Sequence, residues 1–321
     1  MSSAPDSWPR LVGDIGGTNA RFALIEAPGA PIAAARTLAC ADHADPRAAI
    51  ERYLAEGGLP RPRVAAIGIA NPITGDRVQM TNHHWRFSIA DLQRDLGLAR
   101  LRFLNDFTAL ALALPTLEAQ ELVQVGGGTA APSAALGLLG AGTGLGISGL
   151  VPHGERWVPL EGEGGHVTLA AFDAREAAVI DALARRYGHV SAERVLSGPG
   201  IAALHAALAE VDGRAPDGLN AAEITGRALD ASCRFCAQTV DVFCAMLGTV
   251  AADLALTLGA RGGIYIGGGI VPRLGARFAA SPFRARFEDK GRFGDYLARI
   301  PVWVIHADYP ALRGAARALD D

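Results

Sequence analysis

The sequence predicts an α/β protein of two lobes, because apolar strands alternate with helical segments and a strand–glycine turn–strand unit occurs twice. The first unit spans residues 11–24 and the second spans 135–151. No long exact repeat accompanies them, so we interpret the second unit as a structural echo of the first, with chance recurrence as the alternative. With 321 residues, half of them hydrophobic, the chain is long enough for two domains with substantial cores.

The first lobe continues with strands and helices in alternation. Ser88 is a suitable N-cap for one of the helices, and Pro115 ends another. After the first unit, the expected elements are strands at 36–38, 64–70 and 101–104 and helices at 46–56, 88–96 and 107–114.

The second lobe starts in the same style and then becomes mainly helical. Its expected elements are strands at 135–139, 147–151, 262–270 and 302–305, two packed helices within 221–259, a helix at 311–319, and loops at 129–134 and 212–219. The loop at 129–134 suits a connection near a lobe boundary. We expect a small α/β domain of residues 1–116, with the helix at 307–321 packed back on it, and a large α/β domain of residues 117–306.

Composition favours a protein that acts on small molecules. A net charge of −3 and a pI near 6.2 provide no large positive field, so we expect no nucleic-acid or membrane partner. Residues 1–10 lack an apolar core and form neither a signal peptide nor an anchor, which predicts a cytoplasmic location. The apolar window 240–260 contains Asp241 and Asp253 and indicates a buried helix. Four cysteines fit reduced thiols, and we interpret Cys233 and Cys236 as core thiols.

The first glycine turn has the composition of a phosphate-binding hairpin. Gly13, Gly16 and Gly17 let the backbone turn sharply and bring N–H groups close to an anion. Asp14 can hold a hydrated magnesium ion, and Thr18 can donate a hydrogen bond to a phosphoryl oxygen. The turn therefore predicts a nucleotide or another phosphate ligand.

Two common nucleotide-binding motifs are excluded. No Gly-x-x-x-x-Gly-Lys-Ser/Thr element occurs, and Lys290 is the only lysine. The first turn also lacks the Gly-x-Gly-x-x-Gly spacing and is followed by a strand, so a nicotinamide dehydrogenase is disfavoured. The signal is instead the order of three glycine turns, at Gly13–Thr18, Gly142–Gly146 and Gly267–Gly269.

Further stretches accompany these turns along almost the whole chain. They are Met80–His83, Asn105–Ala109, Gly140–Gly146, Gly162–Val167, His189–Gly200, Gly267–Arg273 and Phe287–Phe293. Together with Gly13–Arg21 they resemble the bacterial glucokinase family, in the hexokinase, actin and Hsp70 superfamily and outside its ROK branch. The resemblance implies a two-lobed actin-like ATPase (ribonuclease H-like) fold with a cleft between a small and a larger α/β domain. It also implies a homodimer.

The resemblance implies an ATP-dependent glucokinase that uses Mg²⁺ and phosphorylates the 6-hydroxyl of D-glucose, the first step of glycolysis. Asp14 would hold the magnesium ion through water, and adenosine would lie against Gly267–Gly269. The implied ATP-binding residues are Gly13, Asp14, Ile15, Gly16, Gly17, Thr18, Gly142, Thr143, Gly144, Gly267, Gly268 and Gly269. The implied glucose ligands are Asn105, Asp106, Glu163, His166 and Glu193.

Asp106 follows an apolar strand and precedes a helix, where a carboxylate can take a proton from a sugar hydroxyl. From position alone, capping of the following helix is an equal alternative, and the resemblance favours the general base. Glu163 and His166 stand three residues apart in a glycine-flanked loop and suit the ring of polar partners that a hexose requires. Without the resemblance, Glu193 is interpreted as an exposed helix residue.

Several alternatives stay open at this point. The protein could phosphorylate another hexose, use ADP or polyphosphate as donor, act as a non-catalytic sugar-sensing regulator, or be an actin-like or chaperone-like ATPase. A zinc ligand role for His166 is disfavoured, because no cysteine follows it before Cys233. The roles of Lys290, His83 and His84 are undecided.

Overall fold

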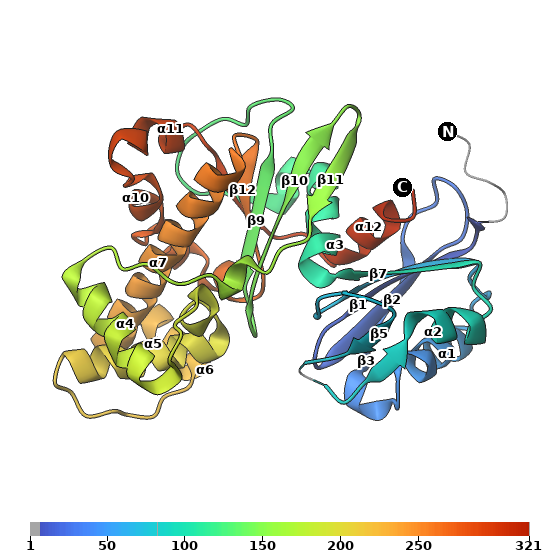
Figure 1. Cartoon of the computed structure of the whole chain (residues 1–321), viewed down its shortest axis with the longest axis horizontal. Coiled ribbons are helices and arrows are strands. Elements are labelled where there is room, and N and C mark those ends of the chain that lie inside the picture. The colour runs from blue at the N-terminus through green and yellow to red at the C-terminus, as the bar shows by residue number, and fades with distance from the viewer. Residues whose placement is uncertain (1–6, 82, 321) are drawn as a thin grey trace. The chain divides into compact units, whose positions relative to one another are not determined.

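The computed structural model describes residues 7–81 and 83–320, and the chain forms two compact units. Unit 1 contains the chain up to Glu118 and the segment from Ala307 onward, and unit 2 contains Ala119–His306 (Figure 1). Asn82, which belongs to one of the stretches that carry the resemblance, lies outside the described residues. Residues 1–6 also lie outside them, so most of the segment 1–10, which was predicted to form neither a signal peptide nor an anchor, is not described.

Unit 1 contains a five-stranded sheet in the order β3-β2-β1-β4-β7. The antiparallel part contains β1 (Arg10–Ile15), β2 (Asn19–Ile25) and β3 (Ala33–Ala39). The strands β4 (Val64–Ile69) and β7 (Arg100–Asn105) extend the sheet parallel to β1. A separate pair contains β5 (Arg77–Gln79) and β6 (Arg86–Ser88).

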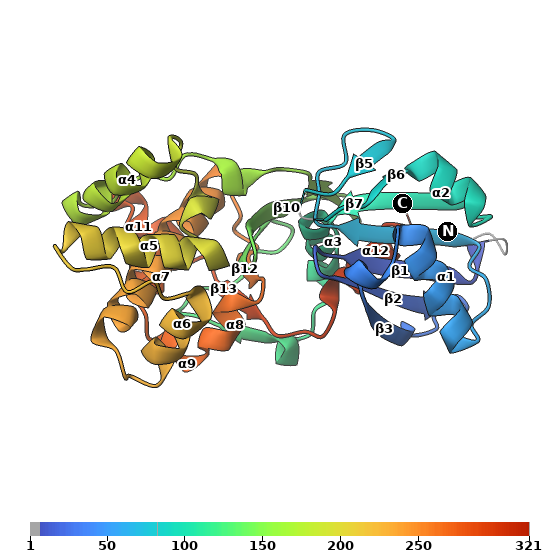
Figure 2. The ribbon, with the colours of Figure 1, turned by 90° about the horizontal axis from the view of Figure 1, so that it is seen from below.

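Helices cover both faces of this sheet. One face carries α1 (Pro46–Gly57) and α2 (Ile89–Asp95), and the other carries α3 (Asp106–Ala113) and α12 (Pro310–Arg317), as Figures 1 and 2 show together. Ser88 caps α2 by accepting the N–H of Asp91, as its sequence position predicts.

The helix α12 packs closely on α3. A Cβ at Gly314 would lie 1.6 Å from the carbonyl oxygen of Ala109, so the two backbones approach to a distance that only glycine permits. The guanidinium of Arg102 also donates to the carbonyl of Ala318 at 2.8 Å. The last helix is therefore an integral part of unit 1.

Unit 2 contains a six-stranded sheet in the order β11-β10-β9-β12-β13-β8. Its strands are β8 (Leu122–Gln124), β9 (Leu136–Ala141), β10 (Leu145–His153), β11 (Arg156–Leu160), β12 (Gly263–Gly267) and β13 (Val302–Ile305). As in unit 1, three antiparallel strands are followed by two strands parallel to the first of them. The structural echo expected from the two glycine turns is confirmed.

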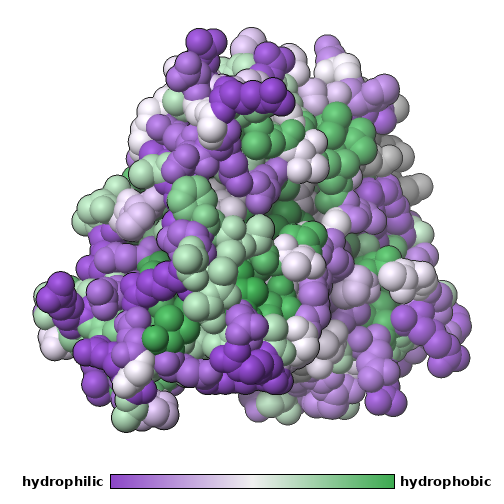
Figure 3. Space-filling model, turned by 60° about the vertical axis from the view of Figure 1, so that its left-hand side comes forward, coloured by the Kyte–Doolittle hydropathy of each residue, from purple (hydrophilic) through white to green (hydrophobic). Residues whose placement is uncertain are grey.

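The helices of unit 2 surround a second core. They are α4 (Ala174–Tyr187), α5 (Gly198–Val211), α6 (Ala221–Leu229), α7 (Arg234–Leu258), α8 (Ile270–Leu274), α9 (Ala276–Ala279), α10 (Phe283–Glu288) and α11 (Gly294–Ala298). Within the described residues, α7 alone is long and apolar enough to cross a membrane, but 72% of its most apolar window is buried. The prediction of a buried core helix is confirmed. On the face shown in Figure 3, hydrophobic and hydrophilic residues are interspersed.

Several elements differ from the sequence-based expectations, among them the helices α4, α5, α8, α9, α10 and α11, which were not expected. The second glycine turn is shorter than the predicted Gly142–Gly146, because Gly146 lies within β10. Gly140, which precedes the turn, lies within β9. A Cβ at Gly140 would lie 2.5 Å from the carbonyl carbon of Gly267, so this glycine is needed for close packing within the sheet. The loop at 129–134 lies inside unit 2, and the short strands β5, β6, β8 and β11 were not expected.

Candidate active site

The first glycine hairpin joins β1 to β2 in unit 1. The N–H of Gly16 donates to the carbonyl of Asn19 at 2.9 Å, and Thr18 is exposed at the turn. Gly13 lies in β1 rather than in the turn, where a Cβ would be 3.0 Å from the Phe22 ring. The turn therefore begins later than the sequence suggested, because Gly13 serves strand packing.

Asp14 lies on β1 directly opposite Arg21 on β2. The Arg21 guanidinium donates to the Asp14 carboxylate at 3.2 Å. Burial raises the pKa of the Asp14 carboxyl, and the charge of Arg21 opposes that effect only partly. A nearby cation stabilises the charged form of a buried carboxylate. The surroundings of Asp14 therefore fit a magnesium ion held through water.

Asn105 and Asp106 lie at the junction of β7 and α3. The side-chain oxygen of Asn105 accepts the backbone N–H groups of Phe107 at 2.9 Å and Thr108 at 3.2 Å, so Asn105 is the N-cap of α3. Asp106 is the first helical residue, and its Oδ1 also accepts the N–H of Phe107 at 2.9 Å. The capping role that the sequence allowed for Asp106 belongs mainly to its neighbour.

The first hairpin and Asp106 meet at one edge of the unit 1 sheet. The strands β1, β4 and β7 are parallel, with Ile15, Ile69 and Asn105 in register at their carboxyl ends. A Cβ at Gly68 would lie 3.6 Å from the Cα of Asp106 and 3.8 Å from the carbonyl oxygen of Gly13. Unit 1 therefore places its candidate phosphate hairpin beside its candidate base, as in other α/β sheets whose ligands bind at strand carboxyl ends.

The second and third glycine turns meet within unit 2. The turn Gly142–Gly144 is closed by a hydrogen bond from the N–H of Gly142 to the carbonyl of Gly144 at 2.8 Å. Gly268 has a φ of +74°, and a Cβ there would lie 2.4 Å from the carbonyl oxygen of Ala141. The loop Gly267–Gly269 therefore packs against the end of the strand that leads into the second turn.

Glu163 precedes a short 3-10 turn, Gly164–His166, whose last residue is His166, and both residues are exposed. The N–H of His166 donates to the carbonyl of Glu163 at 3.0 Å. A Cβ at Gly165 would lie 2.0 Å from the carbonyl oxygen of Leu145, so only glycine fits there. This packing holds the loop on the first residue of β10.

Glu193 is half-buried in the 3-10 turn Ala192–Arg194, so its interpretation as an exposed helix residue was wrong. Its Oε2 accepts the N–H of Leu145 at 2.9 Å. A Cβ at Gly144 would lie 2.5 Å from the same oxygen. Unit 2 therefore brings Glu193, the second glycine turn and the Glu163–His166 loop together.

Leu145 is the residue of this site that sequence reasoning missed. Its N–H contacts Glu193, and its carbonyl oxygen supports Gly165. Both contacts use the backbone, which the sequence does not encode through a side-chain type. The only available signal was its place between Gly144 and Gly146.

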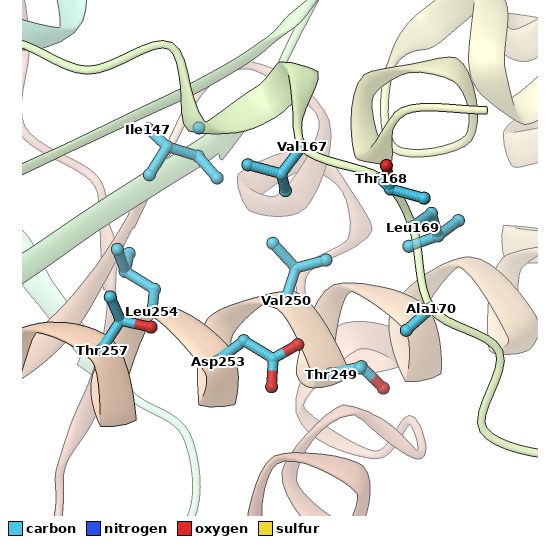
Figure 4. A pocket seen from close by; sticks show the side chains of 11 residues that line it. Ile147, Val167, Thr168, Leu169, Ala170, Thr249, Val250, Asp253, Leu254 and Thr257 are labelled. Atoms are coloured by element: carbon cyan, nitrogen blue, oxygen red, sulfur yellow. The ribbon is translucent and has the colours of Figure 1, made fainter. Parts of the chain in front are cut away.

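A pocket of about 210 Å³ lies between α7 and the segment 164–170, with Ile147 of β10 at one side (Figure 4). Its lining residues are Ile147, Gly164, Val167, Thr168, Leu169, Ala170, Thr249, Val250, Asp253, Leu254 and Thr257. The lining is mainly aliphatic, with few of the polar groups that a hexose requires, and it includes neither Glu163 nor His166. This pocket is therefore distinct from the candidate sugar-binding residues.

The structure gives the undecided residues local partners. Lys290 donates to Asp253 on α7 at 2.6 Å. His83 contacts the rings of His84 and Trp85, with centroid separations of 4.2 Å and 5.1 Å. Trp85 is fully buried and donates to the carbonyl of His43 at 2.9 Å, so this cluster contributes to the packing of unit 1.

Comparison with known proteins identifies the family. A family model described as Glucokinase matches residues 11–321. A glucokinase of Aromatoleum aromaticum is 62% identical over 317 residues, which cover 98% of this chain and 96% of that protein. A solved glucokinase from an Antarctic psychrotroph is 39% identical, with a TM-score of 0.88 over 97% of this chain and 98% of that one.

A more distant structure shares the fold alone. A ROK family glucokinase from Streptomyces griseus, solved in complex with glucose and AMPPNP, is 19% identical and has a TM-score of 0.64. The alignment covers 97% of this chain and 98% of that one. The two α/β units thus have the actin-like ATPase fold of sugar kinases, and the chain belongs to the glucokinase family.

Proposed function

We propose that this chain transfers the γ-phosphoryl group of ATP to the 6-hydroxyl of D-glucose, giving glucose 6-phosphate and ADP as the first step of glycolysis. Membership of the glucokinase family supports the reaction class. The observation that carries the proposal is the joint contact of Leu145 with Glu193 and Gly165. One backbone residue thereby links the candidate sugar ligands to a phosphate-binding turn.

Asp106 is the general base of this proposal. Its hydrogen bond from the N–H of Phe107 fixes one carboxylate oxygen at the start of α3. The carboxylate takes the proton of the 6-hydroxyl as that oxygen attacks the γ-phosphorus. A base held in this way contributes on the order of 10²- to 10⁴-fold in rate, and the rest of the acceleration comes from alignment and charge neutralisation.

The other proposed glucose ligands supply hydrogen bonds of different kinds. Because the side-chain oxygen Oδ1 of Asn105 accepts two backbone N–H groups of α3, its side-chain NH₂ group is the part that can donate to a sugar hydroxyl. The carboxylates of this set accept hydrogen bonds from sugar hydroxyl groups. The imidazole of His166 restricts its sugar hydroxyl partner to one direction of approach. The full set is Asn105, Asp106, Glu163, His166 and Glu193.

ATP is proposed to contact the three glycine turns. Backbone N–H groups of the two hairpins hold its phosphates, and adenosine lies against the third turn. The proposed residues are Gly13, Asp14, Ile15, Gly16, Gly17, Thr18, Gly142, Thr143, Gly144, Gly267, Gly268 and Gly269. Asp14 would hold Mg²⁺ through water, and when bound this ion neutralises phosphate charge.

We further propose that residues 1–116 with 307–321 act as the small domain and residues 117–306 as the large domain of the kinase. The proposed state is a cytoplasmic homodimer whose partner molecules are D-glucose and ATP. The net charge of −3 supports the absence of a nucleic-acid or membrane partner.

The test is sugar-dependent ADP release from magnesium-ATP, measured with glucose, mannose, fructose and N-acetylglucosamine. We expect the highest kcat/KM with glucose and a loss of turnover in Asp106→Asn. A higher kcat/KM with another hexose would reassign the substrate. A folded protein that releases no ADP with any of these sugars would overturn the kinase proposal.

A further inference from the structure

The first turn of α7 contains a cysteine pair, Cys233 and Cys236. Cys233 is the N-cap, with φ of −137° and ψ of 108°, and its Sγ accepts the N–H of Cys236 at 3.3 Å. An N-cap side chain is usually an oxygen acceptor such as serine or aspartate. Here a sulfur has that role, at the positive end of a 25-residue helix.

The two sulfur atoms have different surroundings. Cys233 is half-buried, whereas Cys236 is 0% exposed. The hydrogen bonds from Cys236 hold the pKa of the Cys233 thiol below its ordinary value, and the charge of Arg227 acts in the same direction. Burial raises the pKa of Cys236 to about 12. Cys233 is therefore partly accessible and lies where its thiolate form is stabilised, and the thiol of Cys236 beside it is buried.

The other two cysteines lack this combination. Cys40 and Cys244 are both buried. Burial raises the pKa of Cys40 to about 11 and that of Cys244 to about 12. The interpretation of the pair as core thiols is confirmed for Cys236, which is buried, whereas Cys233 packs against the same core and is only half-buried.

The pair is also within reach of a disulfide. Side chains three residues apart on a helix have Cβ atoms about 5–6 Å apart, and a disulfide requires about 3.5–4.5 Å. Cys233 precedes the helix and has extended backbone angles, so a small change in its torsion angles, outside the helical hydrogen bonds, closes this gap.

We propose that Cys233 is an oxidation site of this protein and that Cys236 is its resolving thiol, so that a peroxide converts the pair to an intramolecular disulfide. The Cys233 thiolate attacks one oxygen of hydrogen peroxide, which forms an S–O bond and breaks the O–O bond. The departing hydroxide takes a proton and becomes water. The Cys236 sulfur then displaces hydroxide from the Cys233 sulfenic acid, and its thiol proton leaves with that hydroxide as a second water.

The first test measures thiol reactivity in the unmodified full-length protein. We treat the native protein with iodoacetamide at neutral pH and follow alkylation at each cysteine by mass spectrometry. Each unit of pKa difference changes the thiolate fraction about tenfold, so we expect Cys233 to react at least about tenfold faster than Cys244. Equal rates at Cys233 and the buried Cys244 would overturn the proposal.

The second test locates the disulfide after treatment with hydrogen peroxide. Trypsin cleaves after Arg227, Arg234 and Arg261, so the disulfide joins peptide 228–234 to peptide 235–261 in an unreduced digest. The second peptide also contains Cys244. Cys244→Ser is therefore the matched control, which should keep the linked peptides, and Cys236→Ser should lose them.

Two results would contradict this assignment. Linked peptides that persist in Cys236→Ser would place the resolving thiol elsewhere, and a Cys233 that stays a free thiol in peroxide would remove the oxidation site. Should Cys236→Ser fail to fold, fragmentation of the linked wild-type peptides distinguishes Cys236 from Cys244 directly. A non-reducing gel should show the oxidised protein migrating as a monomer, because the bond is intramolecular.

Discussion

The carboxylate of Glu193 accepts the backbone N–H of Leu145 at 2.9 Å, at the point where the second glycine turn enters β10. The same carboxylate lies against Gly144, where a Cβ would be 2.5 Å from Oε2. A candidate sugar ligand is thus in direct contact with a candidate phosphate-binding turn. Disturbance of Glu193 should therefore affect the use of both substrates.

We expect Glu193→Ala to lower kcat/KM for glucose and also to raise KM for ATP. Loss of a buried hydrogen-bond partner costs about 1–3 kcal/mol, which corresponds to about a 5- to 150-fold change. In Glu193→Gln the amide oxygen can still accept the N–H of Leu145, so KM for ATP should stay near the wild-type value. Steady-state kinetics with each substrate varied in turn makes this comparison. Equal effects of both variants on ATP would show that the contact with Leu145 has no role.

Gly144→Ala should weaken activity through Glu193, because the new methyl group displaces the carboxylate. Combined with Glu193→Ala, it should cost less than the sum of the two single effects, since the clash is then removed. The double-mutant cycle in kcat/KM measures this coupling. Gly226→Ala on α6 is the control, because a Cβ there meets nothing within 4 Å. Strict additivity would contradict the expected displacement.

Asp106→Asn should lower kcat by about 10²- to 10⁴-fold with a small change in KM for glucose. The amide oxygen of asparagine can still accept the N–H of Phe107, so the start of α3 and the melting temperature should be preserved. Steady-state kinetics and thermal unfolding of the same preparation test both expectations. A kcat near that of the wild type would assign the base to another group.

Asn105→Ala should lower the free energy of unfolding by about 1 kcal/mol, because α3 loses its N-cap. Asn105→Asp keeps an acceptor for the N–H groups of Phe107 and Thr108 and should retain most of that stability. Urea unfolding of the two variants separates this capping role from any role in sugar binding. Equal stability of Asn105→Ala and the wild type would rule out the cap as a source of stability.

Stability should depend on pH through Asp14. Its carboxyl pKa is raised by burial in the folded protein, so the folded state binds this proton more tightly than the unfolded state does. The stability associated with the protonated form is complete below the ordinary pKa and is lost as pH rises through the raised folded pKa. The melting temperature of Asp14→Asn relative to the wild type should therefore increase as pH rises from about 4.

Asp76→Asn provides the control of opposite sign. The N–H of Ala90 donates to Asp76 at 2.8 Å and lowers its pKa, so its contribution to stability is lost as pH falls. The difference between wild type and Asp76→Asn should therefore shrink toward acid pH. Thermal unfolding over one pH series covers both variants. A difference between wild type and Asp14→Asn that does not change with pH would contradict the expected effect of burial.

The sequence predicted the β1–β2 hairpin of unit 1 and the β9–β10 hairpin of unit 2 well, because each combines apolar strands with glycine at the turn. It also predicted that Ser88 caps a helix and that the window 240–260 belongs to a buried helix, since both depend on local composition. The strands β5, β6 and β8 escaped notice because they have three residues each, which is too short for an alternating pattern. The strand β8 also pairs with β13, which is distant in sequence.

The side-chain types in the sequence indicated which residues belong to the candidate site, but only part of their arrangement in space could be predicted. Sequence reasoning selected Glu193 through the resemblance, but it could not place the carboxylate on the backbone of Leu145. It also placed Gly13 in the turn, whereas packing against Phe22 holds it in β1. The N-cap position of Cys233 was missed because cysteine is not among the usual N-cap residues, whereas here its sulfur accepts the N–H of Cys236.

The membership of α12 in unit 1 has a consequence for biosynthesis. Unit 2 is one continuous segment, Ala119–His306, whereas unit 1 needs residues from both sides of it. On the ribosome, every residue of unit 2 is made before the helix that packs on α3 and β1. Unit 2 can thus fold during translation, while unit 1 must wait with one sheet face covered only in part, by α3. Unit 1 is therefore the part of the nascent chain that is most exposed to aggregation and to chaperones.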